Sequence, residues 1–411
     1  MLRTTTAEPT AAGIEWFVEK DITIFANYLK QSNIAYLSIP NNIDSAYTGI
    51  PSVTITLTFY QLLNDRDNHD EVAILGGGNS RSSSLLKTLF ASIPDVLPLT
   101  NSPGDWNALT VSAGTSLSYD DVVIPYDDVV GVKLLVMASG HGCEEFWYTN
   151  INNDTIASHL GLCGGGTYRE IQVYVDGLLA GAVYPFPVIY TGGINPFLWR
   201  PLTGIMSFDI PAYEFDLSPF ILGDGKSHNI QLSMLGGDKE GGVWYLDGSL
   251  LLYRDPHASP ISGSISSHYD SKATVLTTSS PSHSSSSPSS SPSSSSYDIS
   301  SRFDGYSWTT VGVHMYTTTG TLKFGRSNKT IAFEVTGALN STNTNDLLQD
   351  AEEQLTSGWM YAVHNSSVIE IVTASSNNNN NIIINNNNNN NNNNIAAVDV
   401  DYYSLATISR C

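Results

Sequence analysis

Val53-Thr54-Ile55-Thr56-Leu57-Thr58-Phe59-Tyr60 is the clearest strand pattern in the chain, because apolar side chains alternate with three threonines and a tyrosine. Successive side chains on a β-strand point to opposite faces, so this alternation predicts a half-buried strand. Similar β-rich runs occur later, and Asp247-Gly248 fits a hairpin turn inside the last of them. They cover residues 132–138, 171–175, 230–235 and 243–253. Strands at such spacings predict an all-β fold of the sandwich or jelly-roll kind.

The composition supports the same fold class. Of the 411 residues, 41% are hydrophobic and 10% aromatic, which is enough for more than one core. A faint repeat relates residues 14–25, followed by the strand ending at Tyr60, to residues 210–220, followed by 243–253. We therefore expect two jelly-roll-like lobes. The strand that would match 171–177 in the first lobe falls before Met1, so we expect that lobe to lack its opening strands.

Changes in composition divide the chain into six expected regions. The Ser-rich and Asn-rich tracts cannot bury enough surface to offset the entropy of ordering them, so both are predicted to be disordered. The regions are a first lobe at 1–125, a second lobe at 126–256, a Ser/Pro-rich linker at 257–300, a small β module at 301–376, an Asn-rich tract at 377–394 and a tail at 395–411.

The charge balance excludes one class of partner. With 39 acidic and 18 basic residues the formal net charge is -21, which repels phosphate backbones, so we expect no nucleic-acid binding. No apolar run reaches the roughly 18 residues that cross a bilayer, so no membrane span is expected.

The cysteines and glycosylation triplets indicate an oxidising compartment. Of the three cysteines, Cys143 and Cys163 form the natural disulfide pair, and no C-x-x-C spacing indicates zinc. Residues 1–6 lack the features of a signal peptide, so either the chain is cytosolic or its true start lies upstream. The N-x-S/T triplets begin at Asn153, Asn328, Asn340 and Asn365.

The densest run of reactive side chains is Ser139-Gly140-His141-Gly142-Cys143-Glu144-Glu145-Phe146-Trp147-Tyr148-Thr149-Asn150. Carboxylates can move protons at an amide or glycosidic centre, and aromatic faces stack on sugar rings. Adjacent strand residues point to opposite faces, so Glu144 and Glu145 reach one substrate together only if the chain bulges. The alternative is a disulfide-bonded turn with Trp147 in the core. His141 has no partner at metal-ligand spacing, so no metal site is predicted.

A second block, residues 184–201, is crowded with aromatic residues, prolines and glycines, which predicts a rigid loop. Binding groups often lie on such loops, and Tyr190 and Arg200 are the candidates here. The alternative is aromatic packing, with Arg200 paired to a surface acid. The chain has no G-x-S-x-G elbow, so a serine hydrolase is not indicated.

Several blocks together resemble the peptide:N-glycosidase A family of plants and fungi. They are residues 2–10, 13–16, 20–23, 140–150, 169–177 and 185–196. The resemblance implies hydrolysis of the side-chain amide of N-glycosylated asparagine, which releases the glycan and leaves aspartate. It also implies no cofactor, a secreted or vacuolar/lysosomal location, N-linked glycopeptides or glycoproteins as substrates, and paired jelly rolls as in bacterial peptide:N-glycosidase F. Cleavage at the Ser-rich linker would leave two associated chains.

The resemblance also suggests roles for residues. Residues 143–147 are similar to a Cys-Asp-Glu-Trp-Asp run near the catalytic acids of the bacterial enzymes, with Glu145 matching the glutamate and Trp147 replacing the second aspartate. We therefore expect Glu145, with Glu144 as the second candidate, to act as acid or base, and His141 to orient it. The expected glycan-binding residues are Trp147, Tyr148, Tyr190 and Arg200. Family members carry an Asp-Arg pair upstream of the block at 2–10, so this chain is expected to be inactive if that aspartate is essential.

Two other functions fit the same fold. A glycan-binding or structural secreted protein without catalytic activity would use the aromatic loops equally well. A copper monooxygenase would need several histidine ligands on facing strands, and the sequence has no such grouping.

Overall fold

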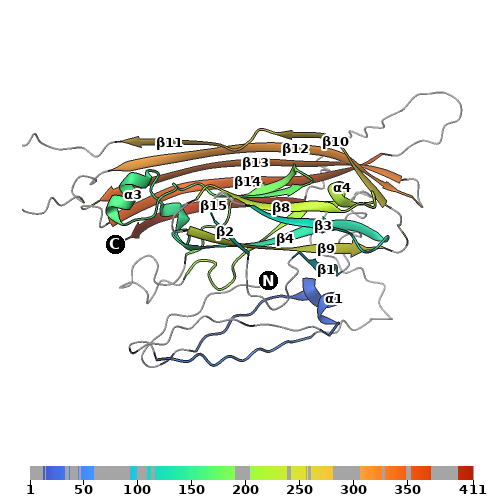
Figure 1. Ribbon diagram of the computed structural model, residues 1–411, viewed down its shortest axis with the longest axis horizontal. Helices are drawn as coiled ribbons and strands as arrows, with labels where there is room; N and C mark the ends of the chain where they lie inside the picture. Colours follow the sequence, from blue (N-terminus) through green and yellow to red (C-terminus); the bar gives the residue numbers. More distant parts are fainter. Residues whose placement is uncertain are drawn as a thin grey trace, which may run out of the picture.

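The computed structural model describes residues 15–32, 48–59, 93–99, 109–112, 116–189, 204–237, 242–255, 261–280, 306–325, 329–348, 353–371 and 397–410, with the single positions 13, 37, 45 and 257. Most of these residues lie in antiparallel strands that form three sheets (Figure 1). The prediction of an all-β fold is therefore confirmed.

Sheet A contains the strand that leads into the densest reactive run. Its strands follow the order β1-β9-β4-β7, and β2 also pairs with β9. They are β1 (Asp95–Pro98), β2 (Leu109–Ser112), β4 (Val129–Gly142), β7 (Ala212–Asp216) and β9 (Gly242–Arg254).

Sheet B lies face to face with sheet A and has the order β3-β8-β5-β6. Apolar side chains from both sheets form one buried cluster, which makes the pair a β-sandwich. The four strands are β3 (Ser116–Val122), β5 (Glu170–Val175), β6 (Leu178–Val183) and β8 (His228–Leu235). The finer prediction of two jelly-roll lobes stays a prediction.

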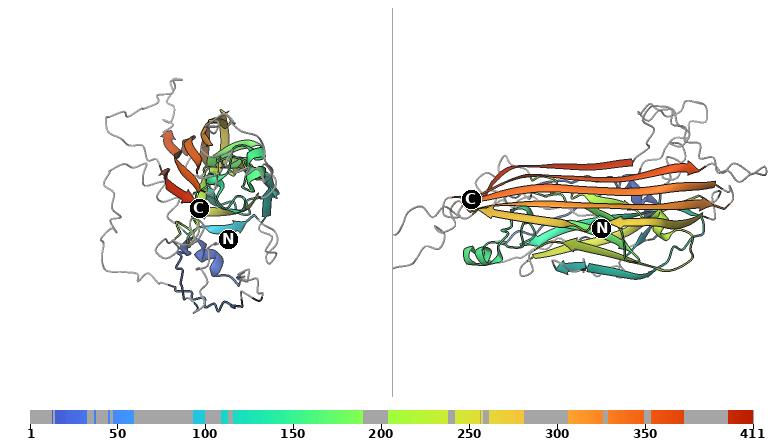
Figure 2. Two further views of the ribbon diagram at one scale, coloured as in Figure 1. Left: turned by 90° about the vertical axis from the view of Figure 1, so that its left-hand side faces the viewer. Right: turned by 90° about the horizontal axis from the view of Figure 1, so that it is seen from above.

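Sheet C is formed by the C-terminal strands and runs along one side of the sandwich (Figure 2). Its order is β10-β12-β13-β14-β15, with β11 also paired to β12. The Tyr316 hydroxyl lies 3.1 Å from the backbone nitrogen of Ala182, which joins this sheet to β6. The strands are β10 (Ile261–Asp270), β11 (Thr274–Ser280), β12 (Ser307–Phe324), β13 (Lys329–Leu348), β14 (Glu353–Ile371) and β15 (Ala397–Arg410).

The helices are short. Asn153 caps α3, because its side-chain oxygen accepts from the backbone nitrogens of Thr155 and Ile156, and Gly161 ends the helix with a positive φ of 65°. None of the helices in the described part of the chain is long and apolar enough to cross a membrane. They are η1 (Thr23–Phe25), α1 (Ala26–Leu29), η2 (Trp147–Thr149), α3 (Asp154–Leu160) and α4 (Ser218–Ile221).

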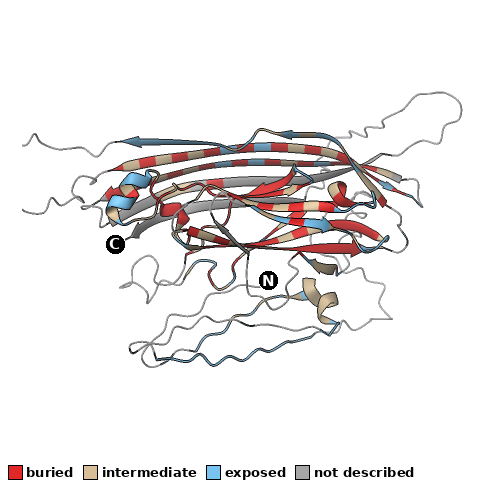
Figure 3. Ribbon diagram, viewed as in Figure 1, coloured by how far each residue is buried: buried red, intermediate tan, exposed pale blue. Residues whose placement is uncertain are grey.

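Strand β5 is covered on both faces. Ile171, Val173 and Val175 are fully buried in the sandwich core. Glu170 and Gln172 point to the opposite face and are also buried, because sheet C lies over them. Burial is therefore continuous through the three layers (Figure 3). This position allows β5 to connect the pocket described below with the C-terminal sheet.

The strand predicted at residues 53–60 is not formed at the described positions 53–59. Residues 53–59 are described, but none is paired in a sheet, and Tyr60 lies outside the described residues. Their apolar side chains are exposed, from 47% for Val53 to 76% for Phe59. Alternation predicts which face of a strand would be buried, but a strand also needs a neighbour to pair with, and no described segment pairs with this one.

The observed sheets also differ from the domain boundaries predicted from the sequence. Strands β1, β2 and β3 belong to the same sandwich as β4–β9, so the border between 1–125 and 126–256 does not separate two lobes. Strands β10 and β11 occupy 261–280, within the predicted linker at 257–300. Strand β15 occupies most of the predicted tail at 395–411 and joins β12–β14 in one large sheet rather than a small module. Residues 281–300 and 377–394 lie outside the described residues.

The hairpin turn predicted at Asp247-Gly248 is wrong, because β9 runs without a break from Gly242 to Arg254. A Cβ atom at Gly248 would lie 2.9 Å from Cδ1 of Leu99 and 3.2 Å from Cδ1 of Leu134. The glycine is therefore required by close packing against side chains on and next to the neighbouring strands of sheet A and not by a turn.

Candidate functional site

The candidate site begins where β4 ends in a tight turn. The backbone nitrogen of Glu144 donates to the His141 carbonyl at 3.1 Å, and that of Glu145 donates to the Gly142 carbonyl at 3.1 Å. A Cβ atom at Gly140 would overlap the Glu144 carbonyl oxygen, so only glycine permits this return of the chain. Because the two glutamates stand on a turn and not on a strand, both line the same pocket.

A disulfide fixes the start of this turn. Cys143 and Cys163 are bonded with their Cα atoms 5.3 Å apart, which confirms the predicted pair. The Asn150 side-chain nitrogen donates to the Cys143 carbonyl at 3.0 Å, and the Ile151 backbone nitrogen donates to the Cys163 carbonyl at 2.9 Å. The segment between the pocket and α3 is therefore held by both covalent and hydrogen bonds.

Glu144 forms a buried ion pair with Arg169, and both side chains are 0% exposed. Nη2 of Arg169 donates to Oε1 of Glu144 at 2.8 Å, and Nε donates to the other oxygen. The indole nitrogen of Trp244 on β9 adds a third donor at 2.7 Å. These three donors engage both carboxylate oxygens, which suits a group that fixes geometry more than one that exchanges protons.

The donors of Arg169 are also used by the backbone around it. Its Nη1 donates to the Tyr168 carbonyl at 2.6 Å and to the Gly166 carbonyl at 3.0 Å. The guanidinium carbon lies 6.0 Å from the centroid of the Trp147 ring. Arg169 thus ties together the turn at Glu144, the chain entering β5 and the aromatic core.

Glu145 is half-buried and lines the pocket next to Glu144. Another part of the lining comes from the connections after β6 and before β7, with Phe186 and Ile210, and from Tyr213 on β7. This part of the lining is braced, because the Phe186 backbone nitrogen donates to the Tyr213 hydroxyl at 2.7 Å. The pocket therefore places a carboxyl group against apolar and aromatic surface.

His141 is half-buried at the end of β4. Its Nε2 lies 3.1 Å from the Ser139 hydroxyl, and its ring meets Tyr245 edge to face at 4.7 Å. The predicted role of orienting Glu145 stays a prediction.

Two residues predicted to bind glycan are buried. Tyr148 is 0% exposed and donates from its hydroxyl to the Val188 carbonyl at 3.1 Å, so its ring is covered by protein, which does not fit the predicted glycan-binding role. Trp147 is 2% exposed; it lines the pocket but packs mainly in the core. Both residues match the packing alternative, because the turn at 143–145 directs the following residues inward.

The remaining predicted site residues are only partly described. Tyr190, Arg200 and Asn328 lie outside the described residues. Asn153 and Asn340 are exposed, and Asn365 lies on β14. No group of three His, Cys, Asp or Glu side chains that could hold a metal ion occurs in the described ranges.

The sequence interpretation missed Arg169 and Trp244 as parts of the site. Arg169 is 25 positions and Trp244 is 100 positions from Glu144 in the chain. Neither has a local pattern that indicates a carboxylate partner. The one available signal was the charge of Arg169 directly before a β-rich run, because a buried cation requires an anion.

Comparison with known proteins gives one family. The family model for peptide N-acetyl-beta-D-glucosaminyl asparaginase amidase A matches residues 1–271. A curated relative, peptide-N4-(N-acetyl-beta-glucosaminyl)asparagine amidase A from Prunus dulcis, is 37% identical over 273 residues, which is 65% of this chain and 46% of the relative. The chain thus spans about half the length of the curated relative it matches.

Two solved structures are distantly similar. One is PNGase F, a glycosylasparaginase from Flavobacterium meningosepticum, with 10% identity, a TM-score of 0.26, and coverage of 39% of this chain and 51% of that chain. The other is recombinant PNGase F, with 9% identity, a TM-score of 0.26 and the same coverage.

Proposed function

Because the chain belongs to the peptide N-acetyl-beta-D-glucosaminyl asparaginase amidase A family, we propose that it hydrolyses the side-chain amide of N-glycosylated asparagine. The reaction releases the glycan and leaves aspartate. The observation that carries the proposal is the pocket at the end of β4, which Glu145 lines together with aromatic residues and beside which Glu144 is anchored.

We assign different roles to Glu144 and Glu145 in this reaction. An amide is a poor electrophile with a poor leaving group, so one group must activate water and another must polarise or protonate the amide. Glu145 is the acid or base of this site, because it lines the pocket and is not the partner of Arg169. Glu144 is a positioning residue, since its ion pair holds the turn that carries Glu145.

The substrates under this proposal are N-linked glycopeptides or glycoproteins. Among the aromatic side chains that line the pocket, the half-buried Phe186 offers apolar surface to the sugar or to the peptide next to it, whereas the buried Tyr213 and Trp244 support the wall. Tyr190 and Arg200 belong to the proposal as further binding groups.

A secreted or vacuolar location and cleavage into two chains also belong to the proposal. The Cys143–Cys163 disulfide and the exposed Asn153 and Asn340 are compatible with passage through an oxidising, glycosylating compartment. Strand β11 ends at Ser280, which pairs with Ser307 at the start of β12. After a cut between these residues, backbone pairing of β12 with β10 and β11 would keep the two chains together.

The test is turnover of a defined N-glycopeptide by the 411-residue chain and by Glu145→Gln. Loss of a proton-transfer group lowers the rate by about 10²- to 10⁴-fold. Glu334→Gln is the matched control, because Glu334 is exposed on β13, away from the pocket. Equal turnover by Glu145→Gln and the unmodified chain would remove Glu145 from the mechanism.

A second function, glycan binding without hydrolysis, is favoured by one observation. The Arg169 and Trp244 contacts hold Glu144 as a positioning group, whereas amide hydrolysis needs two proton-transfer groups. Saturable glycopeptide binding by the unmodified chain, with no aspartate product in the mass spectrum, would support this second function and reject hydrolysis.

A further inference from the structure

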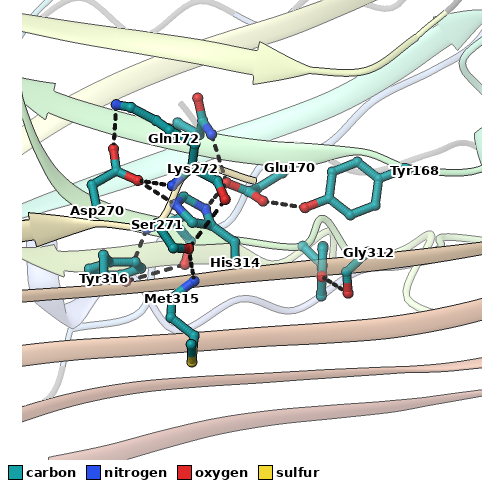
Figure 4. Close-up of polar contacts among 12 residues, drawn as sticks. Tyr168, Glu170, Gln172, Asp270, Ser271, Lys272, Gly312, His314, Met315 and Tyr316 are labelled. Atoms are coloured by element: carbon teal, nitrogen blue, oxygen red, sulfur yellow. Dashed lines mark hydrogen bonds and ion pairs between the residues drawn. The ribbon is translucent and has the colours of Figure 1, made fainter. Parts of the chain in front are cut away.

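His314 on β12 lies between two carboxylates. Its Nδ1 is 2.7 Å from Oε1 of Glu170 on β5, and its Nε2 is 2.9 Å from Oδ1 of Asp270 at the end of β10 (Figure 4). Glu170 belongs to sheet B, whereas Asp270 and His314 belong to sheet C. The imidazole therefore bridges the contact between the two sheets.

This geometry requires a proton. An ionised carboxylate only accepts hydrogen bonds, and a neutral imidazole donates from one nitrogen only. Both contacts of His314 are hydrogen bonds only if the ring is an imidazolium or if one carboxyl group is protonated. At a pH where the cluster has lost that proton, one nitrogen faces a carboxylate with no hydrogen between them.

Water cannot replace the lost contact without opening the interface. The side chain of His314 is 1% exposed and that of Glu170 is 0% exposed. A buried acceptor without a donor is costly, and a buried charge without a partner is more costly. The cost of losing the proton therefore falls on the packing of sheet C against β5.

The other groups around the cluster cannot take over the role of His314 toward Glu170. Tyr168 donates from its hydroxyl to Glu170, and Gln172 donates at 2.8 Å, but both donors are neutral. Lys272 binds Asp270 at 2.6 Å and so balances the other carboxylate. Among the described contacts of Glu170, His314 is the one donor that can be positively charged.

The remaining polar rings nearby are neutral in the pH range of interest. Tyr316 lies next to His314 on β12 with ring centroids 5.8 Å apart, and Tyr174 on β5 interacts with the charges of Glu170, Asp270 and Lys272. The pKa of Tyr174 is raised, mainly by burial. Burial also lowers the pKa of His268 on β10, so this histidine adds little positive charge near Asp270.

We propose that Glu170, His314 and Asp270 form a proton-dependent latch that fastens sheet C to β5 in acid and loosens as the pH rises. Glu170 and Asp270 lie within residues 1–271, which the family model matches, whereas His314 on β12 lies beyond the end of that match. The latch does not depend on the proposed amidase activity.

The direction of the pH effect follows from the raised pKa of His314 and the lowered pKa of Asp270. Burial opposes a charge on His314, but the hydrogen bonds and charges of Glu170 and Asp270 outweigh it and raise its pKa. The stabilisation is thus complete below the pKa of an unfolded histidine, about 6.5, and is lost as the pH rises through the folded pKa. The pKa of Asp270 is about 2, because the contacts with Lys272 and His314 outweigh burial, so its contribution is lost only in strong acid.

The test is amide hydrogen exchange of the 411-residue chain between pH 5 and pH 8, corrected for the intrinsic pH dependence of exchange. Protection in β12 and β13 should fall with rising pH, by about tenfold if the folded and unfolded pKa values differ by one unit. Protection in β4 and β9 should change less, because these strands lie in the sandwich core. Equal pH dependence in all four strands would overturn the latch.

His314→Gln is the decisive variant, because glutamine can donate one hydrogen bond but does not titrate. In this variant protection of β12 should no longer depend on pH. His159→Gln is the matched control, because His159 is exposed on α3, where its Nδ1 lies 2.6 Å from the Thr155 carbonyl. It should behave like the unmodified chain. A steep pH dependence that persists in His314→Gln would also overturn the proposal.

A direct titration covers the case in which His314→Gln does not fold. The ring proton signals of the histidines in the unmodified chain report their pKa values, and Asp270→Asn identifies His314 as the signal that moves most. The His314 pKa should lie above about 6.5 and fall in Asp270→Asn. A His314 pKa at or below the ordinary value would reject the latch.

Discussion

Arg169 holds Glu144 through two hydrogen bonds inside the protein, with neither side chain exposed. Removing one member of such a pair leaves a buried charge without a partner, which costs about 3–5 kcal/mol. We expect Arg169→Met to lower the free energy of unfolding by that amount in urea titrations. The double variant Arg169→Met/Glu144→Met should recover part of the loss, because both charges are gone.

The pair Lys133–Glu214 is the matched control for this experiment. Its atoms are 2.9 Å apart, but the side chains are 26% and 35% exposed. Such pairs contribute about 0–1 kcal/mol. If Lys133→Met destabilised the protein as much as Arg169→Met, burial of the Arg169 pair would not be the cause.

Gly140→Ala tests the turn that brings the two glutamates into one pocket. The added methyl group would overlap the Glu144 carbonyl oxygen, and overpacking of this kind costs about 1–3 kcal/mol. We expect lower thermal stability together with a fall in glycopeptide turnover. Gly49→Ala should change neither quantity, since a Cβ atom at Gly49 meets nothing within 4 Å.

Tyr148→Phe tests whether Tyr148 belongs to the protein core or to the sugar-binding surface. The substitution removes the hydrogen bond to the Val188 carbonyl and should cost about 1 kcal/mol of stability. Because the ring is buried, the KM for a glycopeptide should stay unchanged. A clear rise in KM at unchanged kcat would return Tyr148 to the binding site.

The disulfide makes a prediction about thiols and stability. Alkylation without reduction should leave Cys143 and Cys163 unmodified, because they are bonded to each other. The bridge closes a segment with a sequence separation of 20, so Cys143→Ala with Cys163→Ala should lower stability by about 3 kcal/mol. Mass spectrometry of alkylated peptides and thermal melting check the two parts, and labelling of Cys143 before reduction would contradict the first.

Local patterns predicted the fold class and the disulfide, because both depend on neighbours in sequence. Alternation at residues 171–175 and 230–235 correctly predicted strands β5 and β8. The same reasoning was wrong at residues 53–59, where the pattern is stronger but no described strand pairs with it. Pairing depends on where distant segments lie, and alternation contains no information on that.

The contacts that define the site were beyond local reasoning for the same reason. Glu144 and Glu145 were recognised from their density of reactive neighbours, but the partners of Glu144 are Arg169 and Trp244 from other strands. His314 and Glu170 are 144 positions apart in the chain. A histidine in a threonine-rich strand has no feature in the sequence that indicates a carboxylate on each side.

Residues 168–170 form one of the connections between the glutamate turn and sheet C. Arg169 points to the glutamate turn, while Tyr168 and Glu170 on either side of it contact each other on the face covered by sheet C. A substitution far along the chain, in β12, therefore changes the support of Arg169 without touching the pocket. Loss of turnover in such a variant would therefore be explained by displacement of Arg169 and of the Glu144 turn. It would not show that a residue of sheet C takes part in the reaction.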